Sequence, residues 1–214
     1  LLAACPFMDK QNNLFLYDVF KMRLYLYKAP NYSYEKDIIL KYPIQDFTMD
    51  KQGNFILYTV SDLSVLHKAG PDGKTMEKVF TPAKFNFRLF SSRFQMGRLS
   101  EIPGKGFLFS YPEEYRVYVF DSGLKIVKEL FSEEESTFFP GKAQFPNNLS
   151  PTDFSPKHAK WWGRSLRPAM VFYLGNNRFI QVLAKFKNLS AKFYVNIHDL
   201  NGKTYAVGLE IPFY

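Results

Sequence analysis

The chain has 214 residues and a mass of 25.0 kDa, and its 28 basic and 20 acidic side chains give a formal net charge of +8. A hydrophobic content of 46% is too high for a disordered chain, and the apolar residues are too dispersed to form a membrane-spanning helix. One cysteine and three scattered histidines exclude a disulfide framework and a cysteine zinc cluster, so we expect one globular domain without a cofactor.

Strand-forming residues dominate the sequence. It contains 23 Phe and 14 Tyr, often beside Val, Ile, Leu or Thr, and this composition favours strands over helices. Short apolar runs bounded by Gly, Asn, Asp or Pro recur throughout, whereas no long amphipathic helical stripe occurs. These features predict an all-β fold.

The first predicted element is a hairpin that occurs twice. Residues 8–17 and 49–58 match after a shift of 41 residues, and both begin Met-Asp-Lys-Gln. In the turn, Asn12 of the first copy corresponds to Gly53 of the second. Because both residue types tolerate a positive φ, the exchange fits a tight turn between antiparallel strands.

Further copies follow along the chain, at residues 102–109 and 173–182. The second, third and fourth copies each continue into another hairpin, with strands expected at 64–68 and 75–80, 116–120 and 125–131, and 192–198 and 205–209. Four strands per unit at this spacing indicate the blades of a β-propeller rather than a sandwich.

Two segments, residues 46–58 and 116–121, resemble the six-bladed propellers with NHL-type or TolB-like repeats. The resemblance implies four-stranded antiparallel blades, of which four are present. We expect residues 1–214 to form a single propeller domain or a partial propeller, with a long loop insertion at 132–168. Three arrangements remain possible: the chain forms a closed four-bladed ring, it is a piece of a larger ring, or its last strands pair with a segment that the sequence does not contain. The abrupt start and end of the sequence favour a piece of a larger ring.

The two faces of such a disc are expected to differ. Turns between the first and second strands, and between the third and fourth, lie on one face and are short. The long connections at 81–98 and 132–168 emerge on the other face, together with residues 111–115 and 185–188. Since long loops on a rigid scaffold usually carry function, we expect the binding site there.

The long connections are basic and aromatic, a combination common in binding hot spots. Their residues suit a protein patch or an anionic or sugar-like ligand. We expect the site to comprise Arg88, Arg93, Arg98, Tyr111, His158, Trp161, Trp162 and Arg164. A structural alternative is that the tryptophans fill a gap between blades and the lysines are solvated.

No pattern for catalysis or metal binding stands out, and we expect no catalytic residue and no metal ligand. The acidic run at 132–136 is typical of a solvated segment. Asp46 and Asp50 could line a central channel, as acids do in propeller lactonases, but turn or strand-end roles are favoured. His67 and His198 fall in third strands, where packing or capping is expected.

Three hypotheses for function remain. The favoured one is a non-catalytic binding module; a propeller hydrolase or lyase with a metal in its channel, and an RNA-binding NHL-type propeller, are alternatives. The resemblance also implies export to the periplasm or cell surface. Leu2–Cys5 looks like a lipoprotein signal, yet the repeat places Cys5 opposite Asp46 inside a strand, so whether Cys5 is lipidated or buried stays open.

Overall fold

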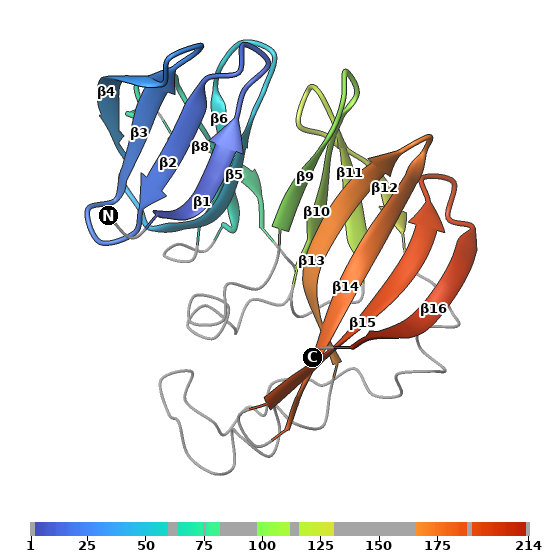
Figure 1. The fold of residues 1–214 in the computed structure, drawn as a ribbon. Helices are drawn as coiled ribbons and strands as arrows, with labels where there is room; N and C mark the ends of the chain where they lie inside the picture. Colours follow the sequence, from blue (N-terminus) through green and yellow to red (C-terminus); the bar gives the residue numbers. More distant parts are fainter. Residues whose placement is uncertain are drawn as a thin grey trace. The chain divides into compact units, whose positions relative to one another are not determined.

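The described part of the chain consists of strands joined by turns and loops. The structure is a computed structural model, and it describes residues 3–59, 64–74, 76–81, 98–111, 116–130, 166–187 and 190–212 (Figure 1). These residues contain sixteen strands and no helix. The strands form four four-stranded antiparallel sheets, and in each sheet the strands follow one another in chain order. The predicted all-β fold with four-stranded blades is therefore confirmed.

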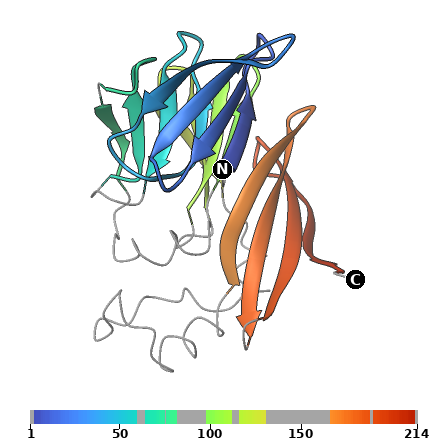
Figure 2. The ribbon, with the colours of Figure 1, turned by 60° about the vertical axis from the view of Figure 1, so that its left-hand side comes forward.

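The chain divides into two compact units, residues 1–85 and 86–214, each with two sheets (Figures 1 and 2). In the first unit the strands are β1 (Ala3–Met8), β2 (Leu14–Asp18), β3 (Arg23–Lys28), β4 (Ser33–Ile39), β5 (Ile44–Met49), β6 (Phe55–Thr59), β7 (Leu66–Ala69) and β8 (Met76–Phe80). In the second unit they are β9 (Arg98–Ile102), β10 (Gly106–Ser110), β11 (Val117–Asp121), β12 (Ile126–Leu130), β13 (Leu166–Gly175), β14 (Arg178–Lys187), β15 (Ser190–Asp199) and β16 (Thr204–Ile211).

The repeated hairpin has the same geometry in both copies. Met8 pairs with Leu14 across the first turn, and Met49 pairs with Phe55 across the second. Asn12 has a φ of 62° and Gly53 a φ of 80°, so both occupy the left-handed region that the turn requires. The structural interpretation of the repeat is confirmed.

In the first unit, the two sheets pack face to face through apolar side chains. Phe15 and Leu24 from the first sheet meet Phe47 and Phe55 from the second, and the rings of Phe15 and Phe55 are 5.8 Å apart in an edge-to-face arrangement. Tyr17 is fully buried, and its hydroxyl oxygen accepts a 3.0 Å hydrogen bond from the backbone N–H of Ile44. This bond joins the second strand of one sheet to the first strand of the next.

In the second unit, the sheets β9–β12 and β13–β16 pack in the same way. Leu108 and Val119 lie in one core cluster with Val171 and Phe179. The backbone N–H of Tyr173 in β13 donates a 2.9 Å hydrogen bond to the Ser100 hydroxyl in β9. Both units therefore use the same packing, in which one face of a blade covers a face of its neighbour.

One boundary differs from the sequence expectation. β13 begins at Leu166, inside the range 132–168 that the sequence assigns to an insertion. Leu166 pairs with Lys185 and Pro168 with Leu183, so the ladder extends β13 toward its N-terminus. Apolar periodicity could not show this, because Arg167 and Pro168 resemble loop residues.

Candidate binding surface

The order of strands gives every sheet two distinct edges. Turns between the first and second strands and between the third and fourth strands lie at one end of the sheet, which we call the turn edge. The connection between the second and third strands lies at the other end, which we call the loop edge, and the chain also enters and leaves each sheet there. In each unit, taken by itself, every long connection therefore begins and ends at a loop edge (Figure 1).

The turn edge is held by aspartate side chains. At four turns, one in each sheet, an aspartate carboxylate accepts hydrogen bonds from the backbone N–H groups two and four residues later. These aspartates are Asp9, Asp50, Asp121 and Asp199. Because each carboxylate satisfies donors of its own turn, this edge is built for structure.

Asp50 shows how strongly such a carboxylate is held. It accepts 2.9 Å bonds from the N–H groups of Gln52 and Asn54 and a 2.8 Å bond from the Asn54 side-chain amide, and it pairs with the Lys68 ammonium at 3.1 Å. Burial raises the pKa of Asp50, but the hydrogen bonds from Asn54, Lys68 and Gln52 outweigh it, so the pKa is below its ordinary value. Asp50 therefore has the turn role favoured by the sequence.

At the loop edge of the first unit, two short connections lie together. The Asp18 carboxylate accepts hydrogen bonds from the N–H groups of Phe20, at 3.0 Å, and Lys21, at 3.1 Å, and so shapes the β2–β3 turn. The Leu40 N–H donates a 2.9 Å bond to the Met22 carbonyl, which ties the β4–β5 connection to that turn.

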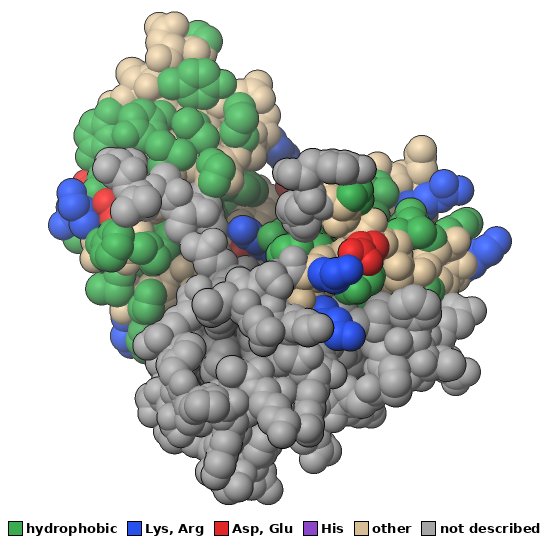
Figure 3. All heavy atoms as spheres, turned by 60° about the horizontal axis from the view of Figure 1, so that its bottom comes forward, with side chains coloured by type: hydrophobic (Ala, Val, Ile, Leu, Met, Phe, Trp, Pro, Cys, Tyr) green, Lys and Arg blue, Asp and Glu red, His purple; other side chains and the backbone are tan. Residues whose placement is uncertain are grey.

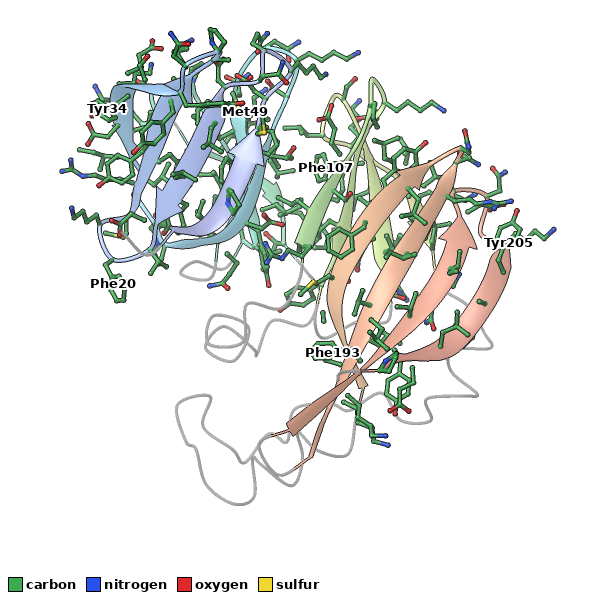
Figure 4. The ribbon with its side chains drawn as sticks, in the orientation of Figure 1. Phe20, Tyr34, Met49, Phe107, Phe193 and Tyr205 are labelled. Carbon is green, nitrogen blue, oxygen red and sulfur yellow. The ribbon has the colours of Figure 1, made fainter. Side chains whose placement is uncertain are left out.

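Exposed aromatic and basic side chains project from these two connections. Phe20 is 78% exposed and lies at the tip of its turn (Figure 4). The Lys41 ammonium lies 5.1 Å from the centre of the Tyr42 ring, within range of a cation–π interaction. We call Phe20, Lys21, Met22, Lys41 and Tyr42 the unit 1 loop patch. Figure 3 shows that both hydrophobic side chains and Lys or Arg side chains are exposed among the described residues.

The histidines of the third strands are structural. His67 lies 3.1 Å from the Thr59 hydroxyl through Nδ1, and its ring lies 6.0 Å from that of Tyr42. His198 makes a 3.1 Å contact between Nδ1 and the Thr204 hydroxyl. Both side chains are buried, in agreement with the packing role expected from the sequence. Asp46 is also buried, and its carboxylate accepts a 3.0 Å bond from the N–H of Phe47.

Two of the expected site residues lie in the described part of the chain. Arg98 begins β9 and pairs with Ser110, the residue before Tyr111, so the structure brings Arg98 and Tyr111 to the same loop edge. Tyr111 is only 2% exposed, and its ring lies 6.3 Å from that of Phe109. The remaining expected residues, Arg88, Arg93, His158, Trp161, Trp162 and Arg164, lie outside the described residues.

The sequence interpretation missed the unit 1 loop patch because its connections are short. Long connections drew attention through their length and basic charge, whereas Phe20 and Tyr42 are separated in sequence and belong to tight segments. Extending the repeat to strand ends could have found them, since it assigns residues 19–22 and 40–43 to the loop edge. Within the described residues, no group of three or more acidic, histidine or cysteine side chains could hold a metal ion.

Comparisons with known proteins agree on the fold. No protein-family model matches the chain, and no curated protein matches its sequence. Among solved structures, Kuenenia stuttgartiensis hydrazine synthase matches 98% of this chain over 49% of its own, with 11% identity and a TM-score of 0.57. A Bacteroides fragilis protein named as a candidate for export matches 99% of this chain over 58% of its own, with 13% identity and a TM-score of 0.55.

A lyase has the same type of fold. Virginiamycin B lyase from Staphylococcus aureus matches 98% of this chain over 69% of its own, with 8% identity and a TM-score of 0.52. At these identities the likeness shows the fold alone, which is an all-β, propeller-type arrangement of four-stranded antiparallel sheets. The chain spans about half the length of the first two structures. In the described residues, no helix is both long and apolar enough to cross a membrane.

Proposed function

We propose that this propeller-type domain is a non-catalytic binding module that recognises a partner at its loop edges. The observation that carries the proposal is the group of aromatic and basic side chains on two connections that are tied together at the loop edge of the first unit. Aspartates at the turn edge are engaged by their own turns, whereas the loop edge of the first unit presents Phe20, Lys41 and Tyr42. Aromatic rings and cations on a rigid scaffold suit recognition of a protein patch or an anionic or sugar-like ligand.

The arrangement of the described histidines supports binding rather than catalysis. His67 and His198 are buried and hydrogen-bonded to threonines, and each belongs to a different unit. A hydrolase or lyase needs acids or histidines that converge on one substrate. The lyase among the similar structures shares only the fold with this chain, so it adds nothing to the enzyme alternative.

The proposal includes the long connections. Arg88, Arg93 and Arg98 would extend the surface, and so would the residues near the second connection: His158, Trp161, Trp162 and Arg164. Tyr111 is buried and would not offer a contact surface. Loss of Arg93 and both tryptophans should weaken binding by more than about 2 kcal/mol if they form a hot spot. We also propose that the ring is of the six-bladed NHL-type or TolB-like kind, and that the protein is exported to the periplasm or cell surface.

A comparison of the two edges tests the function. Three labelled probes would be used at two salt concentrations: a sulfated oligosaccharide, a polyglutamate peptide and an oligouridylate RNA. Phe20→Ala combined with Lys41→Ala should weaken binding of the preferred probe at least tenfold. The matched control, Tyr205→Ala with Lys51→Ala, removes one aromatic and one cationic side chain that are exposed at the turn edge and should leave the affinity nearly unchanged.

The outcomes separate the alternatives. Equal losses in both double variants would mean that binding follows net charge and would refute a loop-edge site. Preference for the RNA, with an affinity that falls steeply as salt rises, would favour the nucleic-acid alternative, because counterions released from phosphates set that slope.

A further inference from the structure

The turn between β2 and β3 displays apolar side chains at a convex tip. The turn consists of residues 19–22, and Phe20 projects from it beyond the ends of both strands (Figure 4). Phe20 is 78% exposed and Met22, the last residue of the turn, is 37% exposed. The Asp18 carboxylate accepts hydrogen bonds from the N–H groups of Phe20 and Lys21 and so fixes the turn. The turn therefore presents these apolar side chains to the surroundings instead of burying them.

Two lysines accompany this tip. The Leu40 N–H donates a 2.9 Å bond to the Met22 carbonyl, and Lys21 and Lys41 each lie one residue beyond that bond. Both lysines are exposed, and within the described residues neither forms an ion pair with a carboxylate. The two connections, residues 19–22 and 40–43, contain no acidic residue. The tip is thus surrounded by positive charge that no neighbouring acid neutralises.

A half-buried tyrosine completes the unit 1 loop patch. The ring of Tyr42 lies 6.0 Å from the buried ring of His67, and the Lys41 ammonium lies 5.1 Å from the centre of the Tyr42 ring. Tyrosine has an apolar ring and a polar end, so it suits the boundary between an apolar layer and water. The patch therefore combines an exposed apolar tip with a boundary residue and two cations.

We propose that the unit 1 loop patch docks on the surface of an anionic lipid bilayer, an inference that rests on the proposed binding role of the loop edge. Phe20 and Met22 enter the outer part of the apolar layer, and Lys21 and Lys41 contact the anionic headgroups. Long cationic side chains can reach headgroups while their stems stay beside apolar groups. The net charge of +8 adds to the attraction toward an anionic surface.

A bilayer fits this patch better than other anionic partners do. A sulfated sugar or a nucleic acid would match the two lysines, but neither offers an apolar layer in which Phe20 and Met22 could be buried together. A protein would need a pocket shaped to the convex tip and lined with acids. A bilayer supplies the charged layer and the apolar layer at once, and it adapts to a convex surface.

Vesicle sedimentation tests the proposal. The protein would be mixed with vesicles of phosphatidylcholine alone and with vesicles that also contain phosphatidylglycerol. It should bind the second kind only, and less at high salt, because salt screens the attraction. Phe20→Ala should weaken binding about tenfold, since burial of a phenylalanine contributes at least that much. Lys21→Gln combined with Lys41→Gln should weaken it about twentyfold, because each cation near an anionic surface contributes about fivefold.

Matched controls lie at the turn edge of the same unit. Lys51→Gln combined with Lys74→Gln lowers the net charge equally, and both lysines are exposed in turns. Tyr32→Ala removes an aromatic ring that is 45% exposed in the β3–β4 turn. A strand of five residues, such as β2, separates the two edges by about 17 Å, which exceeds the screening length of about 8 Å at physiological salt. Both controls should therefore bind almost as well as the unchanged protein, and circular dichroism checks that every variant folds.

A fluorescent label shows whether the tip enters the bilayer. In a Cys5→Ser background, an environment-sensitive dye would be attached to Phe20→Cys and, as the control, to Lys51→Cys. Addition of phosphatidylglycerol vesicles should shift the emission to shorter wavelength for the dye at position 20 and leave it unchanged for the dye at position 51. Vesicle binding without a shift at position 20 would overturn the proposal, because the tip would then stay in water.

The remaining outcomes separate the bilayer from the binding role itself. No binding to phosphatidylglycerol vesicles, or equal weakening in the loop-patch and control variants, would overturn the proposal. If the protein ignored vesicles but bound the polyglutamate, sulfated oligosaccharide or RNA probe through Phe20 and Lys41, the bilayer would be the wrong partner and the binding role of the loop edge would stand. If no vesicle and no probe required these two side chains, both proposals would be wrong.

Discussion

Two glycines of the β9–β10 hairpin, one in its turn and one at the start of β10, should respond very differently to the same substitution. Gly104 has a φ of 74° and Gly106 a φ of 149°, so both adopt backbone conformations that side chains disfavour. A Cβ added to Gly104 would meet no atom within 4 Å. A Cβ added to Gly106 would lie 1.9 Å from the carbonyl oxygen of Phe120, in the neighbouring strand β11. Gly104→Ala therefore measures backbone strain alone, and Gly106→Ala measures strain together with a collision.

The expected magnitudes follow from these geometries. The left-handed conformation costs an alanine about 1–2 kcal/mol, and the lower entropy of the unfolded chain returns about 0.4–1 kcal/mol, so Gly104→Ala should cost about 1 kcal/mol. Relief of the collision at Gly106 requires β10 and β11 to separate locally. Loss of two ladder hydrogen bonds at about 1 kcal/mol each raises the expected cost of Gly106→Ala to about 3 kcal/mol or more.

Urea denaturation followed by far-ultraviolet circular dichroism would measure both variants. In thermal melts, 1 kcal/mol corresponds to roughly 2–4 °C for a chain of this size. The melting temperature should therefore fall by about 3 °C for Gly104→Ala and by about 9 °C or more for Gly106→Ala. Equal losses in the two variants would refute the close approach of Gly106 to β11.

Two further predictions concern the turn aspartates Asp50 and Asp199 and the buried hydroxyl of Tyr17. The pKa of Asp199 is below its ordinary value, chiefly because its carboxylate accepts a hydrogen bond from the Lys203 N–H; burial acts in the opposite direction, and the other hydrogen bonds of the turn add to the lowering. The pKa of Asp50 is also below its ordinary value. A lowered carboxyl pKa stabilises the fold above the unfolded value of about 3.9 and loses that contribution as the pH falls through the folded pKa. The free energy of unfolding, measured by urea denaturation, should thus decrease as the pH falls below about 4, and Asp50→Asn should make that decrease smaller. An equally steep decrease in the variant would mean that protonation of Asp50 does not cause it. Tyr17→Phe should cost about 1–3 kcal/mol by urea denaturation, because it removes the buried acceptor of the Ile44 N–H, and a cost near zero would refute that bond.

The turn edge could be predicted from the sequence because its interactions are local. Asp9 and Asp50 each bond to groups two and four residues later, so the same short pattern specifies the same hairpin wherever it occurs. Asn12 and Gly53 were interchangeable for the same reason, since the turn requires only a residue that accepts a positive φ. Repeats in sequence therefore predicted the strands and the type of fold.

The loop edge could be predicted only in part because its contacts are not local. The bond between the Leu40 N–H and the Met22 carbonyl brings two connections together, and no short pattern marks it. Tyr111 was expected to belong to the binding site, but its position one residue after β10 buries the ring near Phe109. Residue type suggests what a side chain can bind, whereas exposure depends on packing between strands.

A comparison of stability at the two edges would test whether the unit 1 loop patch is free to serve binding. Phe20 is 78% exposed, so Phe20→Ala should change the free energy of unfolding by no more than about 0.5 kcal/mol. At the turn edge, the Asp9 carboxylate accepts bonds of 2.9 Å and 2.8 Å from the N–H groups of Gln11 and Asn13, so Asp9→Ala should cost about 1–2 kcal/mol. Urea denaturation of the two variants would measure the difference. A cost above about 1 kcal/mol for Phe20→Ala would mean that the ring supports the fold, whereas a cost near zero would mean that the ring is free to contact a partner.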